Sequence, residues 1–314
     1  MVHGLTRSFH SQLARLEDPW QGTVEMVFAT AAVAVGTGDG SLLTVLDGDR
    51  DLVPWGVATP PDIPLPALGD SVVLEGGVVG WRSYAVRLSG TGTNLGLSAA
   101  GGRLSSEALA RQLDHVSPPP RTRALLGDDG TDVGLEHRVV RNVVAALDEL
   151  CRGLVEEERA GSGVADAVHA LVGLGPGLTP SGDDVLVGVT GAALRLGGAG
   201  RLPREGLDAL VRALEALPPR STTPVARQML AHAGRGAFAE PLARLLVALG
   251  DDGVAQDALD GLVEALAGLG SWSGSDMLAG ALALARAWLD GEGGRGGASA
   301  DRVERAAVLR TRAV

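Results

Sequence analysis

Residues 173–184 read Gly-Leu-Gly-Pro-Gly-Leu-Thr-Pro-Ser-Gly-Asp-Asp and join two apolar helical segments. The Gly-Pro-Gly stretch sets a tight turn that can leave backbone amides free, and the helix that follows adds the N–H groups and positive dipole of its first turn. Such a place binds an anion, holds a metal ion through the carboxylates, or does both. The candidate residues are Gly175, Gly177, Thr179, Ser181, Gly182, Asp183 and Asp184.

A shortened copy of this motif follows 92 residues later, because SGDDVLVG at 181–188 matches SGSDMLAG at 273–280. Each copy places its serine, its last aspartate and its second glycine at positions i, i+3 and i+7, which share one helix face. The pattern predicts two helices that cross at Gly188 and Gly280 and turn their N-termini toward one cleft. The second copy adds the candidates Ser273, Gly274 and Asp276.

The S-x-x-D spacing of both copies has a structural interpretation as well as a functional one. It is the spacing of a capping box, which accounts for the serine and the last aspartate of each copy. It does not account for Asp183, for the Gly-Pro-Gly turn, or for mid-helix glycines that each cost about 1 kcal/mol relative to alanine. We therefore assign Asp183, Asp184 and Asp276 as candidate catalytic residues.

A third hydroxyl-rich helix start occurs at residues 220–224, Arg-Ser-Thr-Thr-Pro. Arg220, Thr222 and Thr223 can hold a carboxylate or a phosphoryl group together with free amides. The alternative is an ordinary threonine cap before a proline in the first helical turn.

The composition excludes several classes of function. The formal charge is −11, which disfavours binding to nucleic acid or to an anionic membrane. The 314 residues include no lysine, which excludes a P-loop lysine and a Schiff-base lysine. The single cysteine, Cys151, fits a reducing compartment, and no signal peptide or membrane span is evident. We expect a cytoplasmic protein.

The elements that position these residues fall into two parts, and the expected fold class is α+β. Short β-type runs separated by turn signals extend from residue 22 to about residue 89 and predict a small antiparallel barrel or sandwich. Beyond about residue 104 the apolar spacing is helical throughout, with a hinge at residues 117–120 and a glycine-rich linker at 291–297. The predicted domains are 1–103, rich in β-structure, and 104–314, mainly helical and carrying the motif.

The motif at 173–184 resembles the signature of the AllH-like family, long known only as a domain of unknown function. The resemblance continues through Thr222-Thr223, through Ala-His-Ala-Gly at 231–234 and through Gly-Ser-Trp-Ser-Gly-Ser-Asp at 270–276. AllH is a subunit of oxamate carbamoyltransferase in anaerobic allantoin breakdown, a route of purine degradation. The resemblance implies carbamoyl transfer between oxalurate and phosphate, which yields oxamate and carbamoyl phosphate, by a chain that works with other subunits.

Three hypotheses follow. The first is a carbamoyltransferase subunit that holds small anions at its glycine-rich helix starts, where amides and arginine stabilise a tetrahedral oxyanion. The second is a metal-dependent hydrolase in which Asp183, Asp184 and Asp276 hold Mg²⁺ or Mn²⁺. The third is a non-catalytic subunit that binds a small anion.

Overall fold

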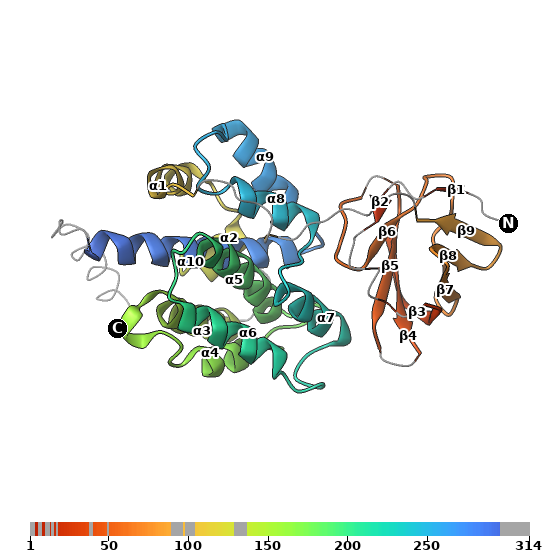
Figure 1. The fold of residues 1–314 in the computed structure, drawn as a ribbon, viewed down its shortest axis with the longest axis horizontal. Coiled ribbons are helices and arrows are strands. Elements are labelled where there is room, and N and C mark those ends of the chain that lie inside the picture. The colour runs from red at the N-terminus through yellow and green to blue at the C-terminus, as the bar shows by residue number, and fades with distance from the viewer. Residues whose placement is uncertain are drawn as a thin grey trace.

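A computed structural model of the chain describes residues 4–5, 8–9, 13, 16, 18–37, 40–48, 50–88, 97, 104–128 and 137–295. Figure 1 shows a β-rich part that contains the N-terminus and a larger helical part that contains the long helix α10. This arrangement confirms the predicted α+β class. The predicted boundary at 103/104 adjoins residues 98–103, which lie outside the described residues.

The β-rich part is a single sheet that curls into a half-barrel. Its strands are hydrogen-bonded in the order β1-β9-β8-β7-β3-β4-β5-β6-β2, and the two outermost strands are only two residues long. Most neighbours are antiparallel, while β1–β9 and β5–β6 are parallel. The strands are β1 Gly4–Leu5, β2 Ser8–Phe9, β3 Trp20–Phe28, β4 Ala31–Gly36, β5 Leu42–Leu46, β6 Gly56–Ala58, β7 Ser71–Glu75, β8 Val78–Trp81 and β9 Tyr84–Arg87.

The alternation of side chains explains how the half-barrel holds together. Strand β3 begins with a buried–exposed alternation, as expected for a sheet with one covered face. Trp20, Trp55 and Trp81 are all buried in the core of this sheet. The three tryptophans therefore fill the core of the half-barrel.

The helical part packs around α5 and α10, which contact each other more extensively than any other pair of helices. Its helices are α1 Ser106–His115, α2 Pro120–Leu125, α3 His137–Val155, α4 Val164–Leu171, α5 Ser181–Gly198, α6 Arg204–Glu215, α7 Pro224–Ala233, α8 Glu240–Ala248, α9 Gln256–Ala267 and α10 Ser273–Arg295, with a 3-10 turn, η3, at Glu157–Arg159. Every described residue of α5 from Ser181 to Ala193 is buried, so α5 is the central helix. No described helix is both long enough and apolar enough to cross a membrane.

Two details differ from the sequence expectation. Residues 117–120 do not separate the two parts; they join α1 to α2, and Pro120 opens α2 at a position where proline is tolerated. The predicted linker at 291–297 is helical as far as Arg295, since α10 continues through Gly291, Gly293 and Gly294.

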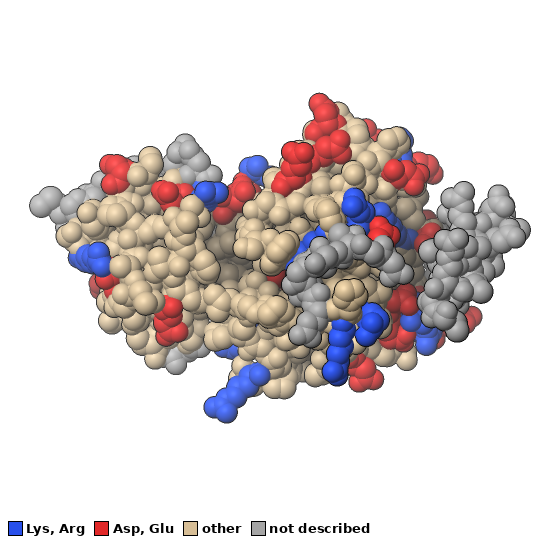
Figure 2. Space-filling view, turned by 180° about the vertical axis from the view of Figure 1, so that it is seen from behind, with Lys and Arg blue, Asp and Glu red and all other residues tan. Residues whose placement is uncertain are grey.

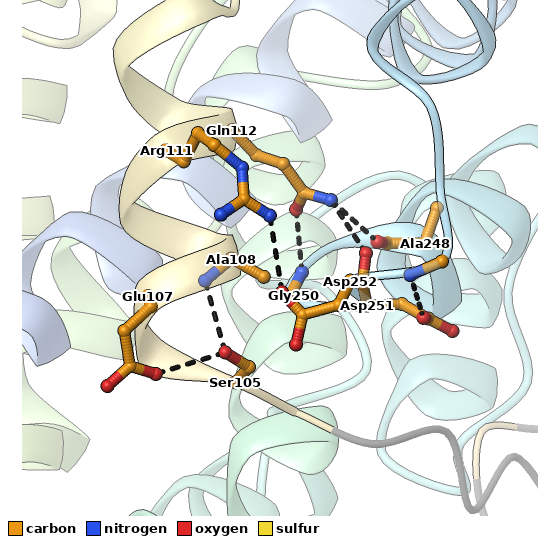
Figure 3. Close-up of polar contacts among 10 residues, drawn as sticks. Ser105, Glu107, Ala108, Arg111, Gln112, Ala248, Gly250, Asp251 and Asp252 are labelled. Carbon is orange, nitrogen blue, oxygen red and sulfur yellow. Dashed lines mark hydrogen bonds and ion pairs between the residues drawn. The ribbon is translucent and has the colours of Figure 1, made fainter.

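Helix α1 is fixed to the turn after α8 by side-chain bonds to backbone groups (Figure 3). The Gln112 amide nitrogen donates to the carbonyls of Ala248 and Asp251, and its oxygen accepts from the Gly250 N–H at 2.7 Å. Ser105 caps α1 by accepting from the Ala108 N–H. The α8–α9 turn is thereby held in place, and α9 leads directly into the second copy of the motif.

The β-rich and helical parts meet at α7 and α8. The Trp55 ring stacks on His232 of α7 with centroids 5.1 Å apart. Leu52 and Glu240, the first residue of α8, exchange two hydrogen bonds, because the Leu52 N–H donates to the Glu240 carboxylate and the Glu240 N–H donates to the Leu52 carbonyl. These contacts connect the half-barrel to the helical part.

Candidate functional site

A cleft of about 630 Å³ lies between the half-barrel and the helical part. Seen from behind, the surface is hollowed between the two parts, and most side chains around the hollow are uncharged (Figure 2). The helical side contributes the loop before α5, the loop before α10 and one face of α7. The predicted site residues Gly177, Thr179, Ser181 and Ser273 line this cleft.

The two copies of the motif are parts of a longer duplication that the sequence comparison underestimated. Leu171-Val-Gly-Leu-Gly175 at the end of α4 corresponds to Leu266-Ala-Gly-Leu-Gly270 at the end of α9. The Gly182 N–H donates to the Leu174 carbonyl, and the equivalent Gly274 N–H donates to the Leu269 carbonyl. The repeated unit is therefore a helix, a loop and a second helix, α4–α5 in one copy and α9–α10 in the other.

Glycines allow these units to pack closely. A Cβ on Gly182 would overlap the Leu171 carbonyl, and a Cβ on Gly274 would overlap the Leu266 carbonyl. Gly182 and Gly274 are thus required where each second helix starts against the first.

The crossing predicted at Gly188 and Gly280 is confirmed. A Cβ on Gly188 would overlap the Met277 carbonyl of α10, and a Cβ on Gly280 would overlap the Val185 carbonyl of α5. Only glycine permits backbones to approach so closely. The crossing brings the two helix starts together, and the Thr179 and Ser273 hydroxyls lie 2.7 Å apart across it.

Asp276 of the second copy is buried and paired with an arginine. The Arg121 guanidinium of α2 donates to both carboxylate oxygens of Asp276, at 2.5 and 2.8 Å, and also to the Ser181 hydroxyl at 2.8 Å. Burial raises the pKa of Asp276, and Arg121 and the Ser181 hydroxyl offset only part of this rise. The same guanidinium lies over the Trp272 ring at 4.6 Å from its centroid.

Asp184 of the first copy is equally buried but has no such partner. It is 1% exposed, and neither of its carboxylate oxygens makes a hydrogen bond of good geometry within the described residues. Burial and the nearby Asp276 raise its pKa well above 3.8, against a smaller lowering by the Ser273 and Thr179 hydroxyls. Asp184 therefore retains its proton to a higher pH than an ordinary aspartate does.

The capping-box interpretation is wrong for α5. The N-cap of this helix is Pro180, which provides no side-chain cap. Instead, Ser181 of the first copy lowers the pKa of Asp276, and Ser273 of the second copy lowers that of Asp184. Each serine thus interacts with the aspartate of the opposite copy.

Asp183 lies elsewhere. Its carboxylate accepts from the Gly173 N–H at 3.1 and 3.2 Å and from the Thr222 hydroxyl at 2.6 Å, and it is not among the described residues that line the cleft. Burial raises the pKa of Asp183, and the bonds from Thr222 and Gly173 offset only part of this rise. Asp183 thus ties the loop before α5 to the loop before α7.

The third helix start behaves largely as an ordinary cap. Thr223 is the N-cap of α7, accepts from the Ala226 N–H, and donates its hydroxyl hydrogen to the Leu178 carbonyl. Arg220 is exposed, and Thr222 bonds to Asp183. Thr222 and Thr223 thus hold the motif loop through Asp183 and Leu178, and none of the three residues lines the described cleft.

The helix start at Ser181 has fewer free amides than the motif suggests. The Gly182 N–H bonds to Leu174 and the Asp183 N–H bonds to the Pro180 carbonyl, so two potential anion-binding donors already have partners. Gly175 has φ +119°, and a Cβ there would lie 2.9 Å from the Ser181 nitrogen. Gly177 has φ +99° with open space around it, and it is the glycine of this turn that faces the cleft.

The three candidate aspartates do not form a metal-binding group. Among the described residues, no cluster of three or more His, Cys, Asp or Glu side chains is arranged to hold a metal ion. Asp183 and Asp276 already have N–H and hydroxyl partners. This arrangement does not favour the Mg²⁺-dependent hydrolase among the three hypotheses.

Sequence reasoning missed Arg121, Trp272 as a cleft residue, and the entire β wall of the cleft. Arg121 follows three prolines on a helix of six residues, which is too short to show apolar periodicity. The extended repeat from Leu171 and Leu266 was a visible signal, and it would have placed Trp272 opposite the Pro-Gly-Leu-Thr-Pro segment of the first copy.

Fold and site together define an α+β protein in which a duplicated helix–loop–helix unit places two buried acids, Asp184 and Asp276, next to hydroxyl groups that line a cleft. Like Asp183, neither of these aspartates is itself among the described residues that line the cleft. Residues 171–285 match the model of the family described as oxamate carbamoyltransferase subunit AllH. This match confirms the resemblance to the AllH-like family, and the matched segment contains both copies of the motif. No curated protein and no solved structure matches the chain.

Proposed function

We propose that this chain is a cytoplasmic subunit of a carbamoyltransferase complex and that its cleft binds oxalurate or oxamate, or a related small anion, with the carbamoyl group at the floor. The family match supports a subunit associated with carbamoyl transfer. The observation that carries the site assignment is Asp184, a buried acid with a raised pKa beneath the Thr179–Ser273 hydroxyl pair.

The chemistry requires a proton at one atom. When a phosphate oxygen bonds to the carbamoyl carbon of oxalurate, the bond from that carbon to the amide nitrogen breaks, and the departing oxamate nitrogen takes a proton. Asp184 can supply this proton through Ser273 or Thr179, and the proton of the attacking hydrogen phosphate then restores the acid. Asp184 suits this role because its raised pKa keeps the proton that it must donate.

The remaining polar groups of the floor can polarise the carbamoyl oxygen. The hydroxyls of Ser181 and Ser273 and the Gly177 N–H are the candidates, because hydrogen-bond donors in a site shielded from water stabilise a developing oxyanion. Arg121 holds Ser181 and Asp276 in place. We assign Asp183, Thr222 and Thr223 to positioning of the loop.

Thermal unfolding of the purified chain tests ligand binding. Oxalurate, oxamate and carbamoyl phosphate are compared with ADP-ribose plus Mg²⁺, and a ligand at about 100 Kd adds roughly 2.7 kcal/mol to the free energy of unfolding. We expect oxalurate or carbamoyl phosphate to raise the unfolding temperature of the wild-type chain. Stabilisation by ADP-ribose with Mg²⁺ alone would contradict the proposal and favour a hydrolase.

The subunit assignment has its own test. We expect carbamoyl phosphate to form from oxalurate and phosphate only when partner subunits are added, and Asp184→Asn to abolish this without loss of assembly. Full turnover by the purified chain alone would show that it is not a dependent subunit.

A further inference from the structure

Exposed apolar side chains gather at the mouth of the cleft. Among the described residues, five large apolar side chains are exposed, and three of these, Phe28, Leu178 and Trp272, line the cleft. They come from three separate places: the end of β3, the loop before α5 and the loop before α10. Exposed large apolar groups that converge on one concavity indicate a binding surface.

The walls below the mouth are also mainly apolar. They include Val53, Trp55, Val225, Met229 and Phe238. Of the described residues that line the cleft, only Arg50, Asp51 and Arg121 are charged, and Arg121 is already bonded to Asp276. The cleft thus has a polar floor at Thr179, Ser181 and Ser273 beneath an apolar upper part.

The volume exceeds that of the family's named substrate. A water molecule takes about 30 Å³ in the liquid, so a cleft of about 630 Å³ has room for far more than the handful of heavy atoms of oxamate. A small anion seated at the floor would leave Phe28, Leu178 and Trp272 exposed to water. Covering them would be favourable because it removes apolar surface from water.

We propose that the substrate of this cleft has two parts: an oxamate-type or carbamoyl head that reaches Thr179 and Ser273, and an apolar ring-bearing body that packs against Phe28, Leu178 and Trp272. This inference rests on the proposed function for the identity of the head. Trp272 supports the ring, since it remains 51% exposed although the Arg121 guanidinium lies over it. The occupant is a small molecule, because the polar groups converge at the floor of a concavity and not on its rim.

The test compares oxamate with oxanilate, its N-phenyl derivative, by isothermal titration of the full chain. The two share one head, so any difference in affinity reports the ring. We expect oxanilate to bind at least tenfold more tightly than oxamate. Equal affinities, tighter binding of oxamate, or binding of neither compound would overturn the inference.

Five variants locate the effect. Phe28→Ala and Trp272→Ala should each remove most of the oxanilate preference while leaving oxamate affinity within a factor of about two. The matched controls are Val27→Ala and Leu68→Ala, which remove exposed apolar side chains that do not line the described cleft. Trp272→Phe keeps a ring and should retain the preference if Trp272→Ala proves unstable. A preference unchanged in both Phe28→Ala and Trp272→Ala would overturn the inference.

The outcomes separate this inference from the proposed function. Carbamoyl transfer by the assembled complex with no preference for oxanilate would remove the inference alone. A strong oxanilate preference without any carbamoyl transfer by the complex would remove the proposed function and leave the two-part substrate standing.

Discussion

Asp184 and Asp276 occupy the same place in two copies of one unit, yet their surroundings differ in the feature that decides their chemistry. Asp276 has an arginine bonded to both oxygens, whereas Asp184 has two nearby hydroxyls and no ion pair with any described residue. The arginine comes from α2, outside both copies. A duplicated frame thus places two acids symmetrically, and one added residue makes them unequal.

The loops before the two helices differ as well. Five residues separate Gly175 from Ser181 in the first copy, but only two separate Gly270 from Ser273 in the second. The longer loop brings Thr179 to the Ser273 hydroxyl, and the shorter one brings Trp272 to Arg121. The residues that the two copies share therefore set the helix packing, and the residues that differ between them set the chemistry of the site.

The largest expected effect comes from removing the arginine. Arg121→Met leaves the buried Asp276 without its cation and should lower the free energy of unfolding by about 3–5 kcal/mol, measured by urea denaturation. The control is Arg123→Met on the same helix, where the side chain is only partly buried and donates to the Pro118 carbonyl at 3.3 Å. Asp276→Asn added to Arg121→Met should recover part of the loss. Similar losses for the two arginine variants would contradict the pairing.

The helix crossing is the next target. Gly188→Ala and Gly280→Ala each introduce a Cβ against the backbone of the facing helix, and overpacking of this kind costs about 1–3 kcal/mol or more. A Cβ added at Gly198 of the same helix would meet no atom within 4 Å, so Gly198→Ala should stabilise the helix by up to about 1 kcal/mol. Thermal unfolding of the three variants measures the contrast. A tolerated alanine at position 188 would refute the close approach.

Much of this frame could be predicted from the sequence. Apolar residues at helical spacing give a strong signal, so the chain beyond about residue 104 is predicted as helical, and the structure has helices there such as Val164–Leu171 and Ser181–Gly198. Gly188 and Gly280 predicted the crossing, because a mid-helix glycine destabilises a helix and close helix packing explains why both copies have one. The same reasoning could not choose among the roles of the polar residues, since one Ser-x-x-Asp pattern fits a cap and a cross-helix contact equally well.

The pairing of each aspartate lay beyond the sequence for a physical reason. Arg121 is 155 positions from Asp276 and reaches it only because α2 packs against α10. Asp183 and Asp184 are neighbours in the chain but point to different surroundings on a helix, one toward Thr222 and the other toward Ser273. The charge state of a carboxyl group depends on such contacts. The sequence could therefore identify the three carboxylates as candidates but could not show which of them keeps its proton.

The unequal acids predict opposite responses to amidation. The folded-state pKa of Asp184 is raised, so the folded state holds its proton more tightly than the unfolded state does, and this contribution is complete below about pH 3.8 and lost as the pH rises through the folded pKa. Asp184→Asn cannot ionise and should become increasingly more stable than the wild type as the pH rises, by about 1.4 kcal/mol for each unit of the shift. Asp276→Asn should instead be less stable than the wild type at neutral pH, because it weakens the bond to Arg121. Burial also raises the pKa of Asp276, so this deficit should narrow as the pH rises. Unfolding curves from pH 4 to pH 8 measure both, and an Asp276→Asn variant more stable than the wild type at neutral pH would contradict the assigned asymmetry.

The smallest effects distinguish the two serines. Ser181→Ala and Ser273→Ala each remove one hydroxyl group, and each lost hydrogen bond should cost only about 0.5–1.5 kcal/mol. Their pH dependence should differ, because the Ser273 hydroxyl lowers the pKa of Asp184 whereas Arg121 still holds Asp276 when Ser181 is removed. Ser273→Ala should therefore raise the pKa of Asp184 further, so that stability is lost over a higher pH range. Ser181→Ala should leave the pH range of this loss unchanged. Stability curves against pH in the Asp184→Asn background provide the control, since Ser273→Ala should lose its pH effect there. A pH shift that persists without the Asp184 carboxylate would mean that another group titrates at the cleft floor.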